Sequence, residues 1–453
     1  MNAEPIVVAV EGCCHGELDS IYKTIAQAEA SGSPKVELLV ACGDFQCVKD
    51  LLDLQCLAVP EKYRKMNSFQ RYFSGEVVAP VLTIFIGGNH EASNVLQSLY
   101  YGGWICPNIY FLGFAGVVNY KGLRIGGISG IYNQRHYRLG HYEKPPYSKG
   151  DLHSVYHLRE LEVYRMAHLQ CRLKQNPLDI IISHDWPQGI WDYGNSKDLL
   201  RRKPYFEEDI RTGKLGSPPL MSLLKQLKPT YWFAAHLHLK FTAIVPHSHD
   251  EHVQTSLSMS SPTPNAPQCI PIVNCNKKST KFLSLDKCEP GREFLQILKI
   301  SAVGSSSIDN AFYPISSSSF LQYDMEWFAI LRKTHNLLSM RRGVVEMPLE
   351  VVPPSDEDIK EVKDIFLNLP FGERIPPRYH CSRGRNDDGS ARCEQTDELF
   401  EMLGIKHLWM ETSATGVAVD NNIVARDRSI PLSFIPQHSG ISMSTDPDEI
   451  DLE

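Results

Sequence analysis

The sequence lacks several patterns that would place it in a common class of protein. Its 12 cysteines are scattered over 453 residues without a CxxC pair, so we expect reduced thiols inside a cell rather than a disulfide framework. No apolar run reaches the roughly 18 residues that a membrane helix needs. The opening stretch MNAEPIVVAVEG has no basic region and no cleavage motif, so we expect neither a membrane span nor a secretory signal.

An excess of positive charge is also missing. The formal net charge is −7 at pH 7, which excludes a general affinity of the whole protein for polyanions. Hydrophobic residues make up 42% of the chain and charged residues 22%, an ordinary globular composition that suffices for one large domain or two. No internal repeat is visible in the sequence.

Five short apolar runs have the composition of β-strands, and each ends in polar residues. Between the first two, Leu18, Ile21, Tyr22 and Ile25 recur at helical spacing, which predicts a helix. This mixture predicts an α+β fold through about residue 245. The strand-like runs cover residues 6–10, 36–41, 81–86, 180–183 and 231–235.

The composition changes after residue 245. Residues 246–279 are rich in Ser, Pro and Asn without periodicity, which predicts a disordered insert. Residues 280–410 resume strand-like and helix-like patterns, with helices expected over 355–372 and 395–405, and are interpreted as a C-terminal accessory domain. For the acidic tail, residues 411–453, we expect little order.

Residues able to bind metal follow all five strand-like runs. One histidine at the end of one strand is more often structural than a ligand, but five such places in a row are a strong signal. The ends of strands at one edge of a sheet are where distant parts of a chain converge. The stretches are VAVEGCCHG with Cys13 and His15, LLVACGDFQ with Asp44, TIFIGGNHE with Asn89 and His90, IIISHDWP with His184, and YWFAAHLHLK with His236 and His238.

The order GxxHG, GD, GNHE, H and HxH resembles that of the calcineurin-like metallophosphoesterases. The stretches GCCHGELD, FIGGNHEASN, ISHDWP and FLSLDKC are similar to one branch of that superfamily, the RNA lariat debranching enzymes. The likeness covers residues 6–245 well and 280–335 moderately. It implies a four-layer α/β/β/α sandwich with a catalytic domain over residues 1–245 and two divalent metal ions.

The resemblance also implies a role for each residue. Asp44 would bridge the two ions, and His90 would be the general acid. Two ions about 3.5–4 Å apart can clamp a phosphodiester and lower the pKa of a bound water. One ion would be held by Cys13, His15 and His238, and the other by Asn89, His184 and His236.

Cys13 stands where the superfamily has an aspartate. A thiolate favours zinc or iron(II) over magnesium or calcium, so we expect iron(II) or zinc, with manganese as a substitute in vitro. Cys14 is the alternative ligand. Because alternate residues of an extended segment face the same way, the spacing favours Cys13 with His15, and it lets His236 and His238 point into one site.

Three neighbouring residues are interpreted as structural. Asp185 follows the predicted ligand His184 and is expected to brace the fold rather than bind metal. Cys42 and Cys47 flank Asp44 and are interpreted as buried thiols. Protein phosphatases have a second aspartate where this chain has Cys47, and a neighbouring arginine that is absent here, which argues against that activity.

A substrate-recognition loop is expected over residues 129–159. Between residues 121 and 174 there are ten Lys and Arg against four Asp and Glu, with Tyr and His interleaved. Basic groups can meet phosphates, and aromatic faces can stack on unpaired bases. The alternative is a solvated surface loop leading into an amphipathic helix. Candidates for contacts with the branch are Arg135, Tyr137, Arg138 and His141.

The function implied by the resemblance is hydrolysis of the 2′–5′ phosphodiester at the branch point of excised intron lariat RNA, by attack of a metal-held hydroxide. The partners would be branched RNA and splicing or intron-turnover proteins, and the location the nucleus. A 3′–5′ nuclease or a cyclic-nucleotide phosphodiesterase on the same fold is the nearest alternative. A non-enzymatic RNA-binding scaffold is the alternative from another class.

Overall fold

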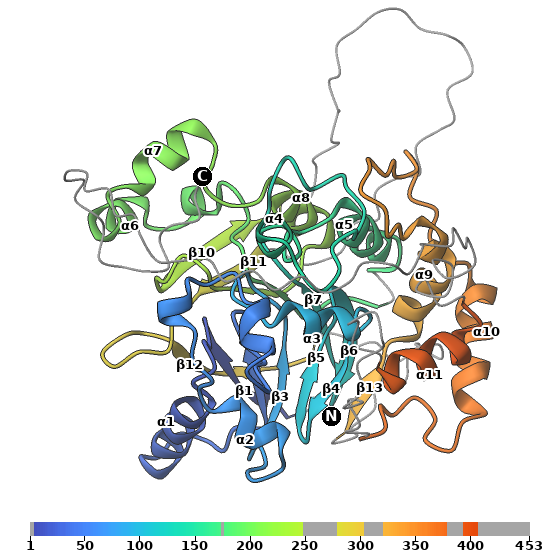
Figure 1. The fold of residues 1–453 in the computed structure, drawn as a ribbon, viewed down its shortest axis with the longest axis horizontal. Helices are drawn as coiled ribbons and strands as arrows, with labels where there is room; N and C mark the ends of the chain where they lie inside the picture. The colour runs from blue at the N-terminus through green and yellow to red at the C-terminus, as the bar shows by residue number, and fades with distance from the viewer. Residues whose placement is uncertain (1–3, 174–175, 248–278, 303–319, 378–392, 406–453) are drawn as a thin grey trace, which may run out of the picture. The chain divides into compact units, whose positions relative to one another are not determined.

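Two β-sheets and the helices around them form the main unit of the protein (Figure 1). The computed structural model describes residues 4–173, 176–247, 279–302, 320–377 and 393–405. The tail predicted to be disordered, and nearly all of the insert before residue 279, lie outside these ranges. Val59–Arg64 belongs to a separate unit, of which the described part has one 3-10 turn, Glu61–Tyr63.

The first sheet has six strands and the second has seven. In spatial order the first contains β12 (Leu295–Ile300), β1 (Ile6–Glu11), β2 (Leu38–Ala41), β3 (Leu82–Phe85), β5 (Ile109–Phe111) and β4 (Gly103–Cys106). The second contains β10 (Phe241–Pro246), β11 (Ser279–Ser284), β9 (Tyr231–Ala234), β8 (Ile180–Ser183), β7 (Leu123–Ile128), β6 (Ala115–Tyr120) and β13 (Leu321–Tyr323).

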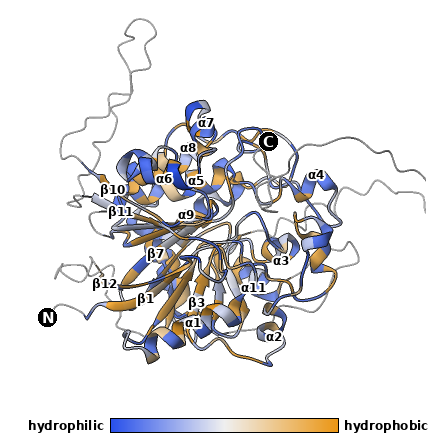
Figure 2. Cartoon of the chain, turned by 90° about the vertical axis from the view of Figure 1, so that its left-hand side faces the viewer, coloured by the Kyte–Doolittle hydropathy of each residue, from blue (hydrophilic) through white to orange (hydrophobic). Residues whose placement is uncertain are grey.

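The two sheets share one hydrophobic core. Val8, Val10 and Ile84 from the first sheet and Ile182 and Phe233 from the second belong to the same buried cluster. Figure 2 shows hydrophobic residues concentrated on these strands, whereas the helices are mixed. Strands buried on both faces are rich in Val, Ile and Leu throughout, which is why the sequence shows short continuous apolar runs.

Helices cover the outer faces of both sheets. Tyr22 of α1 hydrogen-bonds Thr83, 2.7 Å between the oxygens, and Thr83 faces away from the shared core because its neighbour Ile84 faces into it. On the other side, a Cβ at Gly126 would lie 3.2 Å from Met166 of α5. These two contacts complete the predicted four-layer α/β/β/α arrangement.

The described part of the chain contains 11 α-helices. The predicted helices at 355–372 and 395–405 are confirmed as the shorter α10 and α11, and α1 buries the four residues that predicted it. The bounds are α1 Leu18–Ala30, α2 Phe69–Phe73, α3 Ser93–Ser98, α4 Lys149–Leu152, α5 Glu160–Ala167, α6 Ser196–Arg202, α7 Phe206–Thr212, α8 Pro218–Leu227, α9 Met325–Thr334, α10 Asp356–Leu367 and α11 Glu394–Leu403. None of them is long and apolar enough to cross a membrane.

The strands after the insert are built into the sheets of the N-terminal part. β11 lies between β9 and β10 in the second sheet, and β12 pairs with β1 at the edge of the first. The loop between them reaches the segment after β1, where the Cys13 amide donates to the Asp286 carbonyl at 3.4 Å and the Cys288 amide to the Cys13 carbonyl at 3.1 Å. The boundary predicted near residue 245 therefore divides the sequence but not the sheets.

Candidate active site

Five strand ends bring the predicted ligands together. β1, β2 and β3 are parallel neighbours in one sheet, and β8 and β9 are parallel neighbours in the other. Their C-terminal ends lead into the segments that the sequence singled out. The approach is so close that a Cβ at Gly88 would lie 2.2 Å from Asp44 Oδ1 and 2.7 Å from His184 Nε2, so a residue larger than glycine does not fit there.

The first set of ligands converges as predicted. One ligand atom each from Cys13, His15, Asp44 and His238 lies within 4.8 Å of all the others, which suits a single ion bound by nitrogen, oxygen and sulfur. Cys13 is fully buried, and its sulfur accepts the backbone N–H of His236 at 3.2 Å. A hydrogen bond donated to sulfur favours the thiolate, the form that binds metal.

The second set lies on the other side of Asp44. His184 Nε2 is 3.2 Å from Asn89 Oδ1 and 3.2 Å from Asp44 Oδ1, and the rings of His184 and His236 are 5.0 Å apart. The other carboxylate oxygen, Oδ2, is 3.9 Å from His15 Nε2. The two oxygens of Asp44 thus face different ligand sets, as a bridging carboxylate requires.

The charges in the site are arranged for cations. Burial alone would raise the pKa of Asp44, but the His184 and His90 imidazoles hold it well below its usual range. Burial and the neighbouring His184 lower the pKa of His236 to about 3, and burial with His15 nearby lowers that of His238. Although burial alone would lower the pKa of His184, the Asp44 carboxylate raises it. An ionised carboxylate with neutral His236 and His238 suits metal binding, and His184 would give up its proton when an ion binds.

His90 lies beside the site and is not part of either ligand set. Its backbone N–H donates to Asp44 Oδ1 at 2.8 Å, and its ring centroid is 5.5 Å from that of His15. The side chain is 6% exposed. His90 thus lies next to the Asp44 carboxylate, and its role as general acid stays a prediction.

The predicted ligands come together through turns, not through alternation along extended strands as expected from the sequence. β9 ends at Ala234, and His236 and His238 both have positive φ, 63° and 46°. His15 and Asp44 also have φ of 46°. These ligands therefore sit on turns with left-handed backbone, which is strained for residues other than glycine, and the argument from alternation along an extended strand does not apply to them.

Two residues that support the site were missed by the sequence analysis. Glu91 is buried and accepts backbone N–H groups from Phe45, Gln46 and Gly88 at 2.8–2.9 Å, so it joins the Asp44 turn to the Asn89 turn. The Gln46 amide lies 3.1 Å from His15 Nδ1. Such outer contacts orient metal ligands. The sequence feature that could have pointed to Glu91 and Gln46 is their position, because each lies two residues from a predicted ligand.

The family of the chain follows from comparison with known proteins. Residues 6–240 match the calcineurin-like phosphoesterases, and residues 277–408 match the C-terminal domain of lariat debranching enzymes. The chain is 50% identical to the lariat debranching enzyme of Homo sapiens over 411 residues, 88% of this chain and 69% of the relative. The chain belongs to the lariat debranching enzyme family.

A plant member of the family matches more of the chain. The lariat debranching enzyme of Arabidopsis thaliana is 44% identical over 434 residues, 95% of this chain and 91% of the relative. A solved dimetal phosphatase from Danio rerio is 9% identical with a TM-score of 0.33 over 66% of this chain and 94% of that one, a likeness from which we draw nothing. As a member of the lariat debranching enzyme family, the chain is a metal-dependent phosphodiesterase whose fold supports two divalent metal ions.

The predicted recognition loop of this lariat debranching family member packs around a small hydrophobic cluster. Ile131, Val155 and Tyr156 form a buried cluster with Ala58. Of the candidate contacts, Arg135 is exposed and Tyr137 is half-buried with its ring edge-on to Tyr132. Arg138 is exposed and forms long ion pairs with Glu160 and Glu346, 3.6 and 3.8 Å. These three side chains lie at or near the surface, and their contact with RNA stays a prediction.

His141 requires a correction. It is 3% exposed, its Nε2 is 3.0 Å from the Glu162 carboxylate, and its ring packs edge-on against Tyr100 and Phe114. Although burial alone would raise the pKa of Glu162, the charge of His141 lowers it to about 2. His141 is therefore held inside the base of the loop by Glu162, and its burial does not favour direct contact with RNA.

Asp185 links the loop to the site, consistent with the bracing role expected from the sequence. It is 5% exposed and accepts the backbone N–H groups of Tyr132, at 3.2 Å, and Trp186, at 2.8 Å. Burial raises its pKa to about 6. The residue after the predicted ligand His184 thus fixes where the recognition loop leaves the metal centre.

The loop carries a pH-dependent contribution to stability. His157 is 7% exposed with its Nδ1 2.7 Å from that of His136, and burial together with the charge of His136 lowers its pKa to about 2. Below about pH 6.5 His157 binds a proton in the unfolded chain but not in the folded chain. Its contribution to the free energy of unfolding therefore falls as the pH falls, by up to about 1.4 kcal/mol per pH unit.

Replacing His157 with Asn removes that proton site. We expect the wild type to lose about 2 kcal/mol relative to His157→Asn between pH 6.5 and pH 5, measured by urea unfolding at several pH values. The comparison cancels the pH dependence of the metal centre, which both proteins share. Parallel stability curves for the two proteins would contradict the lowered pKa.

Proposed function

We propose that this chain hydrolyses the 2′–5′ phosphodiester bond at the branch point of excised intron lariat RNA. The observation that carries the proposal is the position of Asp44, whose two carboxylate oxygens face two separate ligand sets in a chain of this family. A carboxylate in that position can bridge two cations, and two-cation sites suit in-line displacement at phosphorus.

Different residues of the chain would bind the metal ions, donate the proton and contact the branch. Two divalent ions, when bound, supply charge that stabilises the phosphoryl oxygens and acidifies water. Cys13, His15 and His238 would hold one ion, and Asn89, His184 and His236 the other. His90 would donate a proton to the departing 2′ oxygen, a contribution of about 10²–10⁴-fold. Arg135, Tyr137 and Arg138 would contact the branch.

We propose iron(II) or zinc for the Cys13 pocket, with manganese as a substitute, because thiolate prefers the softer ions. Replacing Cys13 with Asp turns this pocket into an oxygen and nitrogen site. We expect the variant to lose preference for zinc and iron(II) over manganese by about tenfold or more, measured by competition between metals for the purified protein. His184→Ala, in the other pocket, is the control, since it leaves the sulfur in place. An unchanged preference in Cys13→Asp would show that sulfur does not select the ion.

The assay that tests the function compares two RNAs that differ only in one linkage. One contains a 2′–5′ branch, and the other is linear with 3′–5′ bonds, and each is incubated with metals added one at a time. We expect cleavage only at the branch, leaving linear RNA with a free 2′ hydroxyl. Cleavage of both RNAs indicates a general nuclease, and binding without cleavage indicates an RNA-binding scaffold.

The nucleus is the proposed location, because introns are excised there, and splicing or intron-turnover proteins are the proposed partners. Fluorescence microscopy of the tagged full chain, with lariat RNA followed in the same cells, tests the location. A chain found only outside the nucleus, in cells that still clear lariats, would contradict it.

A further inference from the structure

The recognition loop is joined to a segment from the C-terminal part of the chain. Residues 138–141 and residues 339–345 exchange backbone hydrogen bonds, and we call this contact the seam. The Val345 amide donates to the Arg138 carbonyl at 2.8 Å, and the Gly140 amide donates to the Gly343 carbonyl at 3.2 Å. Leu139 and Val344 form an antiparallel bridge between these bonds.

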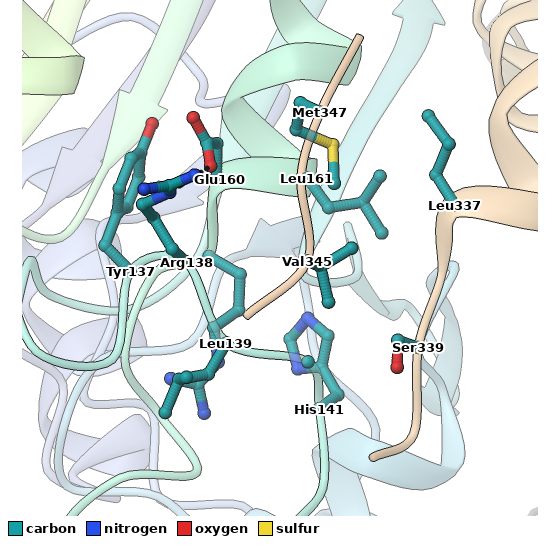
Figure 3. A pocket seen from close by; sticks show the side chains of 12 residues that line it. Tyr137, Arg138, Leu139, His141, Glu160, Leu161, Leu337, Ser339, Val345 and Met347 are labelled. Carbon is teal, nitrogen blue, oxygen red and sulfur yellow. Dashed lines mark ion pairs between the residues drawn. The ribbon is translucent and has the colours of Figure 1, made fainter. Parts of the chain in front are cut away.

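The seam is tight and well packed. A Cβ at Gly140 would lie 2.6 Å from the carbonyl oxygens of both Ser339 and Arg341, so only glycine allows the two backbones to approach this closely. A small cavity lies in the seam, with Leu139 and His141 on one side and Val345 on the other (Figure 3). The C-terminal segment is thus held in a fixed position against the loop.

Three exposed arginines, two in the seam and one in the neighbouring part of the loop, form no ion pair among the described residues. Arg341 and Arg342 are both exposed, and Arg135 is exposed on the loop. None of the three forms an ion pair with any residue that the structure describes. The Arg342 guanidinium lies 5.3 Å from the ring centroid of Tyr142, and its charge adds to burial in lowering the pKa of His136, so it faces the loop.

The loop and the segment joined to it thus expose three guanidinium groups in a chain of net charge −7. Arginine binds phosphate through two parallel hydrogen bonds, and neighbouring positive charges concentrate a polyanion. Branched RNA also differs from linear RNA in having three strands that leave one nucleotide. If one loop binds the branch nucleotide, a second positive surface beside that loop can bind the phosphates of an arm that leaves the branch.

We propose that Arg341 and Arg342 bind the phosphates of one single-stranded RNA arm that leaves the branch, so that the C-terminal segment completes the RNA-binding surface of the recognition loop. The inference rests on the proposed function, because it names a further part of the same substrate. It assigns to residues 339–345 a direct contact with substrate in addition to their place in the fold.

The test compares the wild type with the double variant Arg341→Gln/Arg342→Gln. Three substrates are used: a branched RNA with long arms, a branched RNA with each arm trimmed to one nucleotide, and bis(4-nitrophenyl) phosphate. We expect KM for the long-armed RNA to rise about tenfold with kcat nearly unchanged, and the slope of log affinity against log salt to fall by about 1.4 for two lost contacts. The two small substrates are expected to react as in the wild type.

Two further variants complete the design. Lys360→Gln/Lys363→Gln removes two positive charges from α10, where no ion pair of these lysines is found among the described residues, and is expected to match the wild type. Arg341→Lys/Arg342→Lys keeps the charge and is expected to recover most of the salt dependence. The inference is overturned if Arg341→Gln/Arg342→Gln binds the long-armed RNA as tightly as the wild type does. It is also overturned if the variant loses as much affinity for the trimmed RNA as for the long-armed RNA.

The outcomes separate this inference from the proposed function. If the wild type binds the long-armed RNA without cleaving it, the proposed function fails. The affinities of the wild type and the arginine double variant for that RNA then still decide whether the seam binds an arm. If the wild type cleaves the branch and the double variant is unaffected, only the inference fails.

Discussion

His90→Ala is expected to lower the rate of branch cleavage by about 10²–10⁴-fold while the protein keeps both metal ions. The imidazole lies next to the site without belonging to either predicted ligand set, and the backbone N–H of His90 donates to Asp44 Oδ1 at 2.8 Å. Alanine preserves that backbone contact. The expected result is therefore an intact metal centre without a proton donor for the leaving oxygen, measured by single-turnover cleavage and by metal analysis.

The choice of leaving group makes this test specific. An unactivated 2′ oxygen needs a proton as it departs, whereas 4-nitrophenolate is stable without one. We expect His90→Ala to lose much less activity on bis(4-nitrophenyl) phosphate than on branched RNA. His247→Ala serves as the control, since His247 hydrogen-bonds Thr280 at 2.8 Å and belongs to neither ligand set. Loss of both metals in His90→Ala, or equal losses on the two substrates, would contradict the role of general acid.

The sequence predicted the convergence of the ligands for a sound reason. Each ligand-bearing segment follows a short, largely apolar run, and such runs form strands buried on both faces. Parallel neighbours such as β1, β2 and β3 then end at a common edge. The identity and order of the polar residues after these strands were enough to indicate the family.

The local geometry of the ligands could not be predicted in the same way. The spacing of His236 and His238 suggested an extended segment, but both residues adopt positive φ after the strand has ended. A left-handed backbone at a non-glycine residue is imposed by surrounding contacts, not by the residue's own preference. The spacing therefore selected residues that do lie together, but the alternation behind that prediction is not found in the structure. Their role as ligands stays a prediction.

Long-range partners explain the other differences. His141 was a reasonable candidate for RNA contact because it stands in a basic and aromatic stretch, but Glu162 and Tyr100 bury it. Likewise β11 and β12 follow one another along the chain, yet they enter different sheets. Neither outcome is visible in local sequence, because each depends on residues far away along the chain.

Asp44→Asn is expected to weaken binding at both metal pockets by more than about 100-fold, since even an outer-shell partner of a ligand is worth about 10–100-fold. The carboxylate has one oxygen 3.9 Å from His15 Nε2 and the other 3.2 Å from His184 Nε2. A neutral amide supplies one weaker oxygen donor and no negative charge, so it cannot hold two cations close together.

The pattern across variants distinguishes a bridge from an ordinary ligand. His238→Ala and His236→Ala should each weaken a different ion, whereas Asp44→Asn should weaken both, as measured by metal titration of the apoprotein. Asp185→Asn is the matched control, because it neutralises another buried carboxylate that adjoins His184 but accepts from the backbone amides of Tyr132 and Trp186. This variant should keep both ions. An Asp44→Asn protein that retains one ion at wild-type affinity would place this carboxylate in a single pocket, and the two ligand sets would then have to act without a shared residue.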